Sequence, residues 1–125
     1  MGKNAGTVLV IDDDAAVRSS LKFALEVEGF VVRLYDRPAA LLADKTLPRN
    51  ACLVIDYRMP DMNGLELVDT LRARSVSLPV ILITTRANEE LRSFAANSGI
   101  GYVLEKPLSD GALVESIRSA LGACD

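Results

Sequence analysis

The chain has 125 residues, of which 50% are hydrophobic and 25% are charged, and its formal net charge is −3. This length fits one domain with a substantial core, and the mild acidity disfavours direct binding of nucleic acid. The sequence contains no histidine, which excludes histidine-based catalysis, histidine-ligated metal and a phosphohistidine of its own. The sequence has neither an apolar run that approaches a membrane span nor a disulfide framework, so we expect a cytoplasmic protein with no membrane contact.

Short apolar runs alternate along the chain with amphipathic stretches. Continuous apolar runs are typical of strands that are covered on both faces, and they span residues 7–11, 31–35, 52–55, 80–83 and 102–104. After each run, apolar residues recur at helical spacing, which predicts a helix with one buried face. The residues that define these faces are Val17, Leu21 and Leu25; residues 39–43; Leu65, Val68 and Leu71; Leu91, Phe94 and Ala95; and Leu113, Ile117 and Leu121.

Local signals mark the ends of several of these helices. Asp14, Asn88 and Ser109 stand where a side chain can cap the first turn of a helix. Gly29 and Gly99 stand where a glycine ends one. The regular alternation of strands and helices predicts an α/β fold, in which a parallel sheet carries helices on both faces and the crossovers are right-handed.

Polar residues follow four of the predicted strands. In an open α/β sheet, ligands collect at the carboxyl ends of the strands. The residues found there are Asp12 and Asp13 after the first strand, Asp56 after the third, Thr84 after the fourth and Lys106 after the fifth. We therefore expect three carboxylates, a hydroxyl and an ammonium group to meet in one shallow site.

Clustered carboxylates repel one another and need a counter-charge. Mg²⁺ suits such a site because it prefers oxygen ligands and uses one or two carboxylates, with Mn²⁺ as a substitute. A metal, a lysine and a threonine around one more aspartate suit phosphoryl transfer, which requires positioning and neutralisation of charge. We predict that Asp56 is the nucleophile that forms an acyl phosphate. Mg²⁺ would bridge a phosphoryl oxygen to Asp13 and Asp56, while Lys106 and Thr84 would contact the other oxygens.

Four motifs at the strand ends resemble those of a known family, the receiver domain of bacterial two-component response regulators. They are Ile-Asp-Asp-Asp at 11–14, Asp-Tyr-Arg-Met-Pro-Asp-Met-Asn-Gly at 56–64, Ile-Thr-Thr at 83–85 and Glu-Lys-Pro at 105–107. The resemblance covers about residues 7–121 and implies a single receiver domain over residues 1–125. The form Asp-x-Arg-Met-Pro looks most like the nitrogen-fixation and nitrogen-regulation branches, whose receivers often precede DNA-binding or ATPase modules.

The resemblance implies a flavodoxin-like (CheY-like), doubly wound, five-stranded parallel sheet with strand order 2-1-3-4-5. It also implies Mg²⁺-dependent transfer of a phosphoryl group to Asp56 from the phosphohistidine of a sensor histidine kinase or a histidine phosphotransfer protein. Asp12 and Asp13 take the role of the acidic pair, and Arg58 supplies a metal-binding backbone carbonyl.

Further roles follow from the same resemblance. Thr84 becomes the switch hydroxyl and Lys106 the phosphate-contacting lysine, which Pro107 follows through a cis peptide bond. Phosphorylation would then change the face formed by the fourth helix, the fifth strand and the fifth helix. That face would reach a downstream partner or an output domain, or a second copy of the chain.

The chain departs from the family pattern at several positions near the site. The family commonly places a switch aromatic three residues before the lysine, where this chain has Val103. Tyr102 stands one residue earlier, so it faces the other side of the strand and serves either edge packing or a recognition surface. Thr85 is bulkier than the residue that the family often has there and would narrow access to the phosphate. Arg58 and Arg86 flank the acceptor, where they either tune the phosphate or keep the surface soluble.

Two other functions compete with the signalling switch. A metal-dependent phosphatase of the aspartyl-phosphate type needs a second acid two residues after the nucleophile, and this chain has Arg58 there. A degenerate receiver that acts only as an interaction module would be expected to lose its acids, its threonine or its lysine, and this chain keeps them all. The favoured prediction is therefore a phosphoacceptor and not a turnover enzyme.

Overall fold

A computed structural model of the chain describes residues 6–122, in which five strands alternate with five helices. The strands are β1 (Thr7–Ile11), β2 (Val31–Tyr35), β3 (Ala51–Asp56), β4 (Val80–Thr84) and β5 (Tyr102–Glu105). The helices are α1 (Ala15–Val27), α2 (Pro38–Ala43), α3 (Gly64–Ala73), α4 (Glu89–Asn97) and α5 (Asp110–Gly122). Asp14, Asn88 and Ser109 accept hydrogen bonds from the first turns of α1, α4 and α5, which confirms their predicted capping roles.

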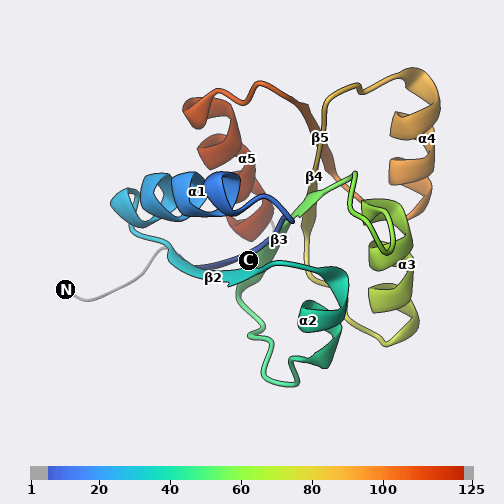
Figure 1. Cartoon of the computed structure of the whole chain (residues 1–125), viewed down its shortest axis with the longest axis horizontal. Coiled ribbons are helices and arrows are strands. Elements are labelled where there is room, and N and C mark those ends of the chain that lie inside the picture. The colour runs from blue at the N-terminus through green and yellow to red at the C-terminus, as the bar shows by residue number, and fades with distance from the viewer. Residues whose placement is uncertain (1–5, 123–125) are drawn as a thin grey trace.

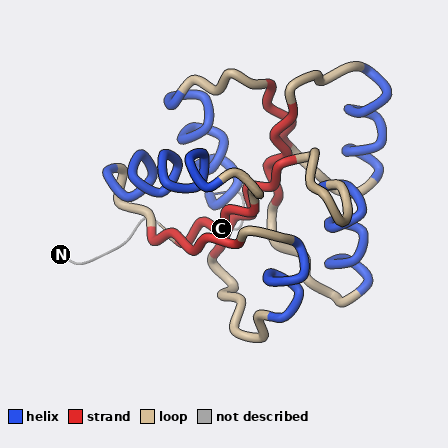
Figure 2. Tube along the Cα trace, in the orientation of Figure 1, coloured by secondary structure: helices blue, strands red, loops and turns tan. Residues whose placement is uncertain are grey.

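The strands form one parallel sheet in the order β2-β1-β3-β4-β5. Figure 1 shows α1 and α5 on one face of this sheet and α2, α3 and α4 on the other. The tube in Figure 2 shows the same two layers of helices around the central strands. The predicted α/β class and the strand order implied by the resemblance are both confirmed.

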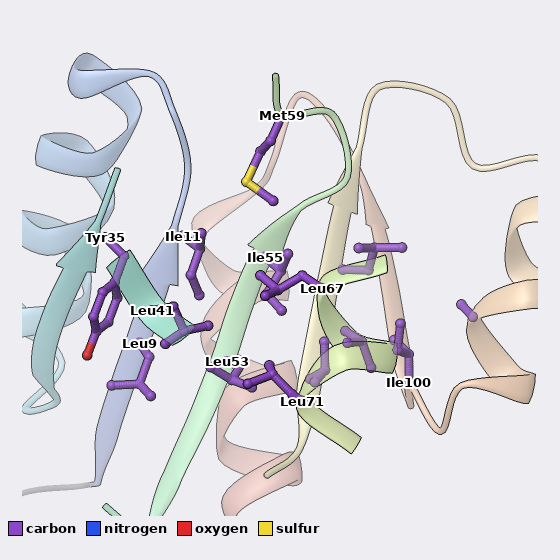
Figure 3. Packing of buried hydrophobic residues seen from close by; sticks show 14 of the residues in the cluster. Leu9, Ile11, Tyr35, Leu41, Leu53, Ile55, Met59, Leu67, Leu71 and Ile100 are labelled. Atoms are coloured by element: carbon purple, nitrogen blue, oxygen red, sulfur yellow. The ribbon is translucent and has the colours of Figure 1, made fainter. Parts of the chain in front are cut away.

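Two apolar clusters hold the layers together, one on each face of the sheet. Side chains alternate along each strand, so Leu9 and Ile11 of β1 join one cluster and Val8 and Val10 join the other. Every residue of the central strand β3 is buried. Figure 3 shows the cluster under α2 and α3, into which Met59 points from the loop after β3. The start of that loop is thereby tied to the core.

One predicted core residue lies at the surface. The spacing of Leu91, Phe94 and Ala95 predicts that all three are buried, but the side chain of Phe94 is 53% exposed, so this prediction is wrong. Leu91 and Ala95, four residues apart, form the narrow stripe of α4 that reaches the core. Phe94 lies beside this stripe, at a surface hollow that also includes Thr85 and Arg86.

Three strands extend one residue beyond their predicted ends. Asp56, Thr84 and Glu105 are the last residues of β3, β4 and β5 rather than the first residues of the loops. Backbone hydrogen bonds continue there, since Tyr57 N–H donates to the Ile83 carbonyl (2.7 Å) and Lys106 N–H donates to the Thr84 carbonyl (2.8 Å). The polar residues of the site are therefore fixed by the sheet itself.

Two expectations drawn from composition concern the cysteines and the membrane. Cys52 is buried in β3, as expected of a small apolar core residue, whereas Cys124 lies outside the described residues. Over residues 6–122, none of the helices is both long enough and apolar enough to cross a membrane.

Candidate functional site

Three carboxylates meet at the carboxyl ends of β1 and β3. Asp12 follows β1 and is 3% exposed, and Asp56 ends β3 and is 7% exposed, whereas Asp13 is exposed to solvent. One oxygen of each carboxylate lies within 4.8 Å of the others. The structure thus brings together the three aspartates that the sequence predicts as one acidic cluster.

A tight turn from β1 into α1 fixes Asp12. Its carboxylate accepts a hydrogen bond from Asp14 N–H (2.9 Å), and its carbonyl accepts one from the Arg18 guanidinium (2.7 Å). Asp14 in turn caps α1 by accepting from Ala16 N–H and Val17 N–H at 2.9 and 3.3 Å. The third acid of the Asp-Asp-Asp run is therefore a helix cap, which leaves Asp12 and Asp13 for the cluster.

Burial makes this cluster electrostatically unfavourable when it is fully ionised. The pKa of Asp12 is raised, chiefly because burial removes solvent from the carboxylate. The pKa of Asp56 is also raised by burial and, next, by the negative charge of Asp12. Lys106 and the backbone N–H of Arg58 lower the pKa of Asp56, but burial and the charge of Asp12 outweigh them. The site therefore has less positive charge than its carboxylates require.

A divalent cation would supply the missing charge. All three candidate ligand atoms are carboxylate oxygens, the donor type that Mg²⁺ and Mn²⁺ prefer. Zinc would need imidazole or thiolate ligands, and the sequence has no histidine. The residues present thus fit a hard cation such as Mg²⁺.

Lys106 reaches the same cluster from β5. Its Nζ lies 3.5 Å from Oδ1 of Asp56, and its backbone N–H is held by β4 through the carbonyl of Thr84. The following Lys106–Pro107 peptide bond is cis, the geometry that the resemblance implies. A cationic side chain is therefore placed beside the buried carboxylate of Asp56.

Thr84 lies at the same edge of the sheet, but its hydroxyl is engaged with the loop that follows it. The side chain is 5% exposed. Its Oγ1 accepts a hydrogen bond from Arg86 N–H (3.2 Å) and donates to the Arg86 carbonyl (3.3 Å). The hydroxyl thus holds the start of the β4–α4 loop in this structure.

Arg58, Thr85 and Arg86 line a surface hollow beside the ends of β3 and β4. The hollow has a volume of about 310 Å³ and is also lined by Tyr57 and Phe94. The side chains of Arg58, Thr85 and Arg86 are all exposed. Their side chains line this hollow beside the ends of β3 and β4.

Tyr102 and Val103 face opposite sides of the sheet, as predicted from their adjacent positions. Tyr102 packs against the cluster formed with α1 and α5, whereas Val103 packs against the cluster under α3 and α4. Val103 pairs in register with Leu82, two residues before Thr84. Valine, and not an aromatic ring, therefore stands on the face of β5 that corresponds to the face of Thr84 on β4.

One polar contact near the site, made by Glu105, does not follow from the sequence motifs. Oε2 of Glu105 accepts a hydrogen bond from Ala87 N–H (3.1 Å) in the β4–α4 loop. The Glu-Lys-Pro motif assigns no role to Glu105. Its register opposite Thr84 is the signal that would have placed it on the same face as the threonine.

Comparisons with known proteins identify the family of the chain. A family model described as the response regulator receiver domain matches residues 8–118. The transcriptional regulatory protein FixJ of Azorhizobium caulinodans is 42% identical over 116 residues, which cover 92% of this chain and 54% of that protein. The C4-dicarboxylate transport transcriptional regulatory protein DctR of Rhodobacter capsulatus is 36% identical over 119 residues, covering 94% and 60%. The chain therefore spans a little over half the length of these relatives.

Solved structures of other proteins have the same fold. The crystal structure of FixJ-N matches with a TM-score of 0.86 and 36% identity, covering 98% of this chain and 96% of that one. The chemotaxis protein CheY4 of Vibrio cholerae matches with a TM-score of 0.85 and 25% identity, covering 92% and 98%. Because the family model spans nearly the whole chain, the protein belongs to the response regulator receiver domain family, the phosphorelay signalling modules of two-component systems.

Proposed function

We propose that Asp56 accepts a phosphoryl group in a Mg²⁺-dependent reaction and that this modification switches the conformation of the domain. The observation that carries the proposal is the placement of Asp56, buried within 4.8 Å of two further acids and 3.5 Å from the Lys106 ammonium. The donor would be the phosphohistidine of a sensor histidine kinase or of a histidine phosphotransfer protein.

In the transfer, a carboxylate oxygen of Asp56 attacks phosphorus while the bond from phosphorus to the donor imidazole nitrogen breaks. The donor nitrogen keeps the electron pair of that bond, and because the other ring nitrogen carries a proton, the leaving group is neutral imidazole. Asp12, Asp13, Asp56 and the backbone carbonyl of Arg58 would hold Mg²⁺, which neutralises charge on the phosphoryl oxygens when bound. Lys106 would pair with one of these oxygens, since its Nζ already contacts Asp56.

The new group adds about −1.5 to −2 charges at one carboxylate. Thr84 would respond by turning its hydroxyl from Arg86 toward a phosphoryl oxygen, and the β4–α4 loop would follow. The affected face comprises α4, β5 and α5, where we propose contact with a downstream partner, an output domain or a second copy of the chain. Relatives that are transcriptional regulatory proteins favour an output in gene control in the cytoplasm.

We further propose that Arg58, Thr85 and Arg86 control access to the phosphoryl group. Their position around the hollow beside β3 and β4 supports this role. Guanidinium groups form charge-assisted hydrogen bonds to phosphate oxygens, so either arginine could also contact the phosphoryl group directly.

Two observations disfavour the alternative functions. Arg58 stands where an aspartyl-phosphate phosphatase needs its second acid, so a turnover enzyme lacks a general acid at that place. A degenerate receiver would not need to retain a buried aspartate in contact with a lysine, and Asp56 and Lys106 form that pair.

Incubation with acetyl phosphate and Mg²⁺, followed by intact mass measurement, tests the proposal. We expect the mass gain of one phosphoryl group, dependent on Mg²⁺ and abolished by Asp56→Asn. Asp61→Asn, which changes an exposed aspartate of the same loop, should leave the gain intact. A chain that gains no mass with Mg²⁺, or that gains it equally as Asp56→Asn, would refute the proposal. Steady hydrolysis of a small phosphate ester would favour the phosphatase instead.

A further inference from the structure

The β4–α4 loop is held at two successive backbone N–H groups by side chains of the sheet. The Thr84 hydroxyl at the end of β4 accepts from Arg86 N–H (3.2 Å). The Glu105 carboxylate at the end of β5 accepts from Ala87 N–H (3.1 Å). Ala87 also faces α4, because its carbonyl accepts from Nε of Arg92 (3.4 Å). This one peptide segment therefore joins β4, β5 and α4.

The sheet fixes the position from which Glu105 makes this contact. Thr84 and Glu105 are register partners in the parallel pair of β4 and β5, so their side chains leave the same face. The adjacent Lys106 N–H donates to the Thr84 carbonyl (2.8 Å), which continues the ladder past Glu105. Val103 lies two residues earlier on that face and has no polar group, so it cannot make such a contact with the loop.

We propose that Glu105 is a positioning residue that holds the β4–α4 loop in the unphosphorylated conformation through Ala87. This proposal rests on the proposed phosphorylation of Asp56. When Thr84 turns toward the phosphoryl group, Arg86 N–H loses its acceptor and the segment from Arg86 to Ala87 shifts. The hydrogen bond to Glu105 then breaks, because the backbone of Glu105 stays in the ladder.

The contacts of α4 indicate where this release is transmitted. Near its N-terminal end, α4 is joined to the loop through Arg92 and through Asn88, which accepts from Leu91 N–H (2.8 Å). At its C-terminal end it is joined to α3, because Ser98 Oγ donates to Asp69 Oδ1 (2.8 Å). Figure 1 shows α3 and α4 side by side. Release of Ala87 would therefore move the first turn of α4 while its last turn remains anchored.

Glu105 thereby couples β5 to the β4–α4 loop, as the switch aromatic does elsewhere in the family, but by different chemistry. It links β5 to the β4–α4 loop through a hydrogen bond instead of a ring rotation. A contact made in only one of two states biases the equilibrium between them. Removal of this contact should favour the phosphorylated conformation.

Titration with beryllofluoride in the presence of Mg²⁺, followed by backbone amide spectra of the full chain, tests this role. For Glu105→Ala we expect saturation at a beryllofluoride concentration about threefold to tenfold lower than for wild type, as for loss of one exposed charge-assisted hydrogen bond. Before any addition, its Ala87 amide signal should already be displaced toward the saturated position. Glu105→Gln keeps an oxygen acceptor, so the beryllofluoride concentration at the midpoint of its titration should lie close to that of wild type.

Glu115→Ala is the matched control, since it removes one exposed glutamate from α5 and should leave the midpoint unchanged. Equal midpoints for Glu105→Ala and wild type would overturn the role of Glu105 while leaving the phosphorylation of Asp56 intact. A Glu105→Gln midpoint equal to that of Glu105→Ala would overturn the hydrogen bond as its basis. A wild-type chain that does not respond to beryllofluoride would instead overturn the proposed function, and this role with it.

Discussion

At the scale of single residues, the site combines buried negative charge with too little positive charge to balance it. Asp12 and Asp56 are both buried, and burial is the largest cause of the raised pKa of each. Because these pKa values lie above the ordinary 3.8, the folded protein binds more protons than the unfolded chain just above that pH. The contribution of these two carboxyl groups to the free energy of unfolding is thus fully present below pH 3.8 and is lost as the pH rises through their raised pKa values.

Asp12→Asn should therefore stabilise the metal-free protein at pH 7. The amide keeps an oxygen that can accept from Asp14 N–H but removes a buried charge, so we expect the melting temperature to rise by a few degrees. Mg²⁺ should raise the melting temperature of wild type by binding the folded state and should raise that of the variant much less. Thermal unfolding with and without Mg²⁺ measures both effects.

Asp61→Asn provides the control, because it removes an exposed charge from the loop between β3 and α3. It should change neither the melting temperature without metal nor the rise that Mg²⁺ causes. An Asp12→Asn protein that is less stable than wild type without metal would contradict the electrostatic origin of the effect. A Mg²⁺ response as large as that of wild type would show that Asp12 does not contribute to cation binding.

At the scale of elements, the junction between β3 and α3 positions Asp56. Asn63 and Glu66 form a capping box at the start of α3, with Glu66 N–H donating to Asn63 (2.9 Å) and Asn63 N–H donating to Glu66 (2.8 Å). Gly64 N–H donates to the Tyr57 carbonyl (2.8 Å), which closes the loop. The helix therefore begins directly against the end of the strand that carries Asp56.

Gly64→Ala should disturb this junction. A Cβ at Gly64 would lie 2.7 Å from Cδ1 of Leu82 and 3.1 Å from the backbone oxygen of Asp56. We expect a loss of about 1–3 kcal/mol in the free energy of unfolding, as for overpacking of a close-packed core. Urea denaturation measures this loss.

Gly111→Ala is the matched control in α5, because no described atom lies within 4 Å of a Cβ built there. It should be neutral or stabilise by up to about 1 kcal/mol, since alanine favours helix more than glycine does. Equal stability of Gly64→Ala and wild type would mean that the backbone at the junction yields without cost.

The sequence predicts most of these elements because their signals are local. Asp14 was expected to cap α1, and it does so, since a capping side chain interacts with the two or three residues that follow it. The opposite facing of Tyr102 and Val103 follows equally from strand geometry. Phe94 was placed wrongly because helical spacing does not reveal how wide a stripe of α4 the core covers.

At the scale of the whole molecule, parallel topology gathers the site from distant segments. Asp12, Asp56 and Lys106 are brought to one edge because their strands run in the same direction in the order β2-β1-β3-β4-β5. This convergence could be predicted from the alternation of strands and helices. Side-chain hydrogen bonds between elements could not, as with Glu105, which accepts from the backbone N–H of Ala87, or with the Tyr35 hydroxyl, which donates to Asp44 (2.5 Å). Such pairs depend on register and loop conformation.

We propose that the phosphoryl group is carried by Asp56 and by no other acid of the cluster. Borohydride reduces an acyl phosphate to an alcohol and so converts a phosphorylated aspartate to homoserine. After treatment with acetyl phosphate and Mg²⁺, peptide mass analysis of the reduced protein should find homoserine at position 56 alone. Homoserine at position 12 or 13, or its absence from position 56, would contradict the assignment of Asp56 as the acceptor.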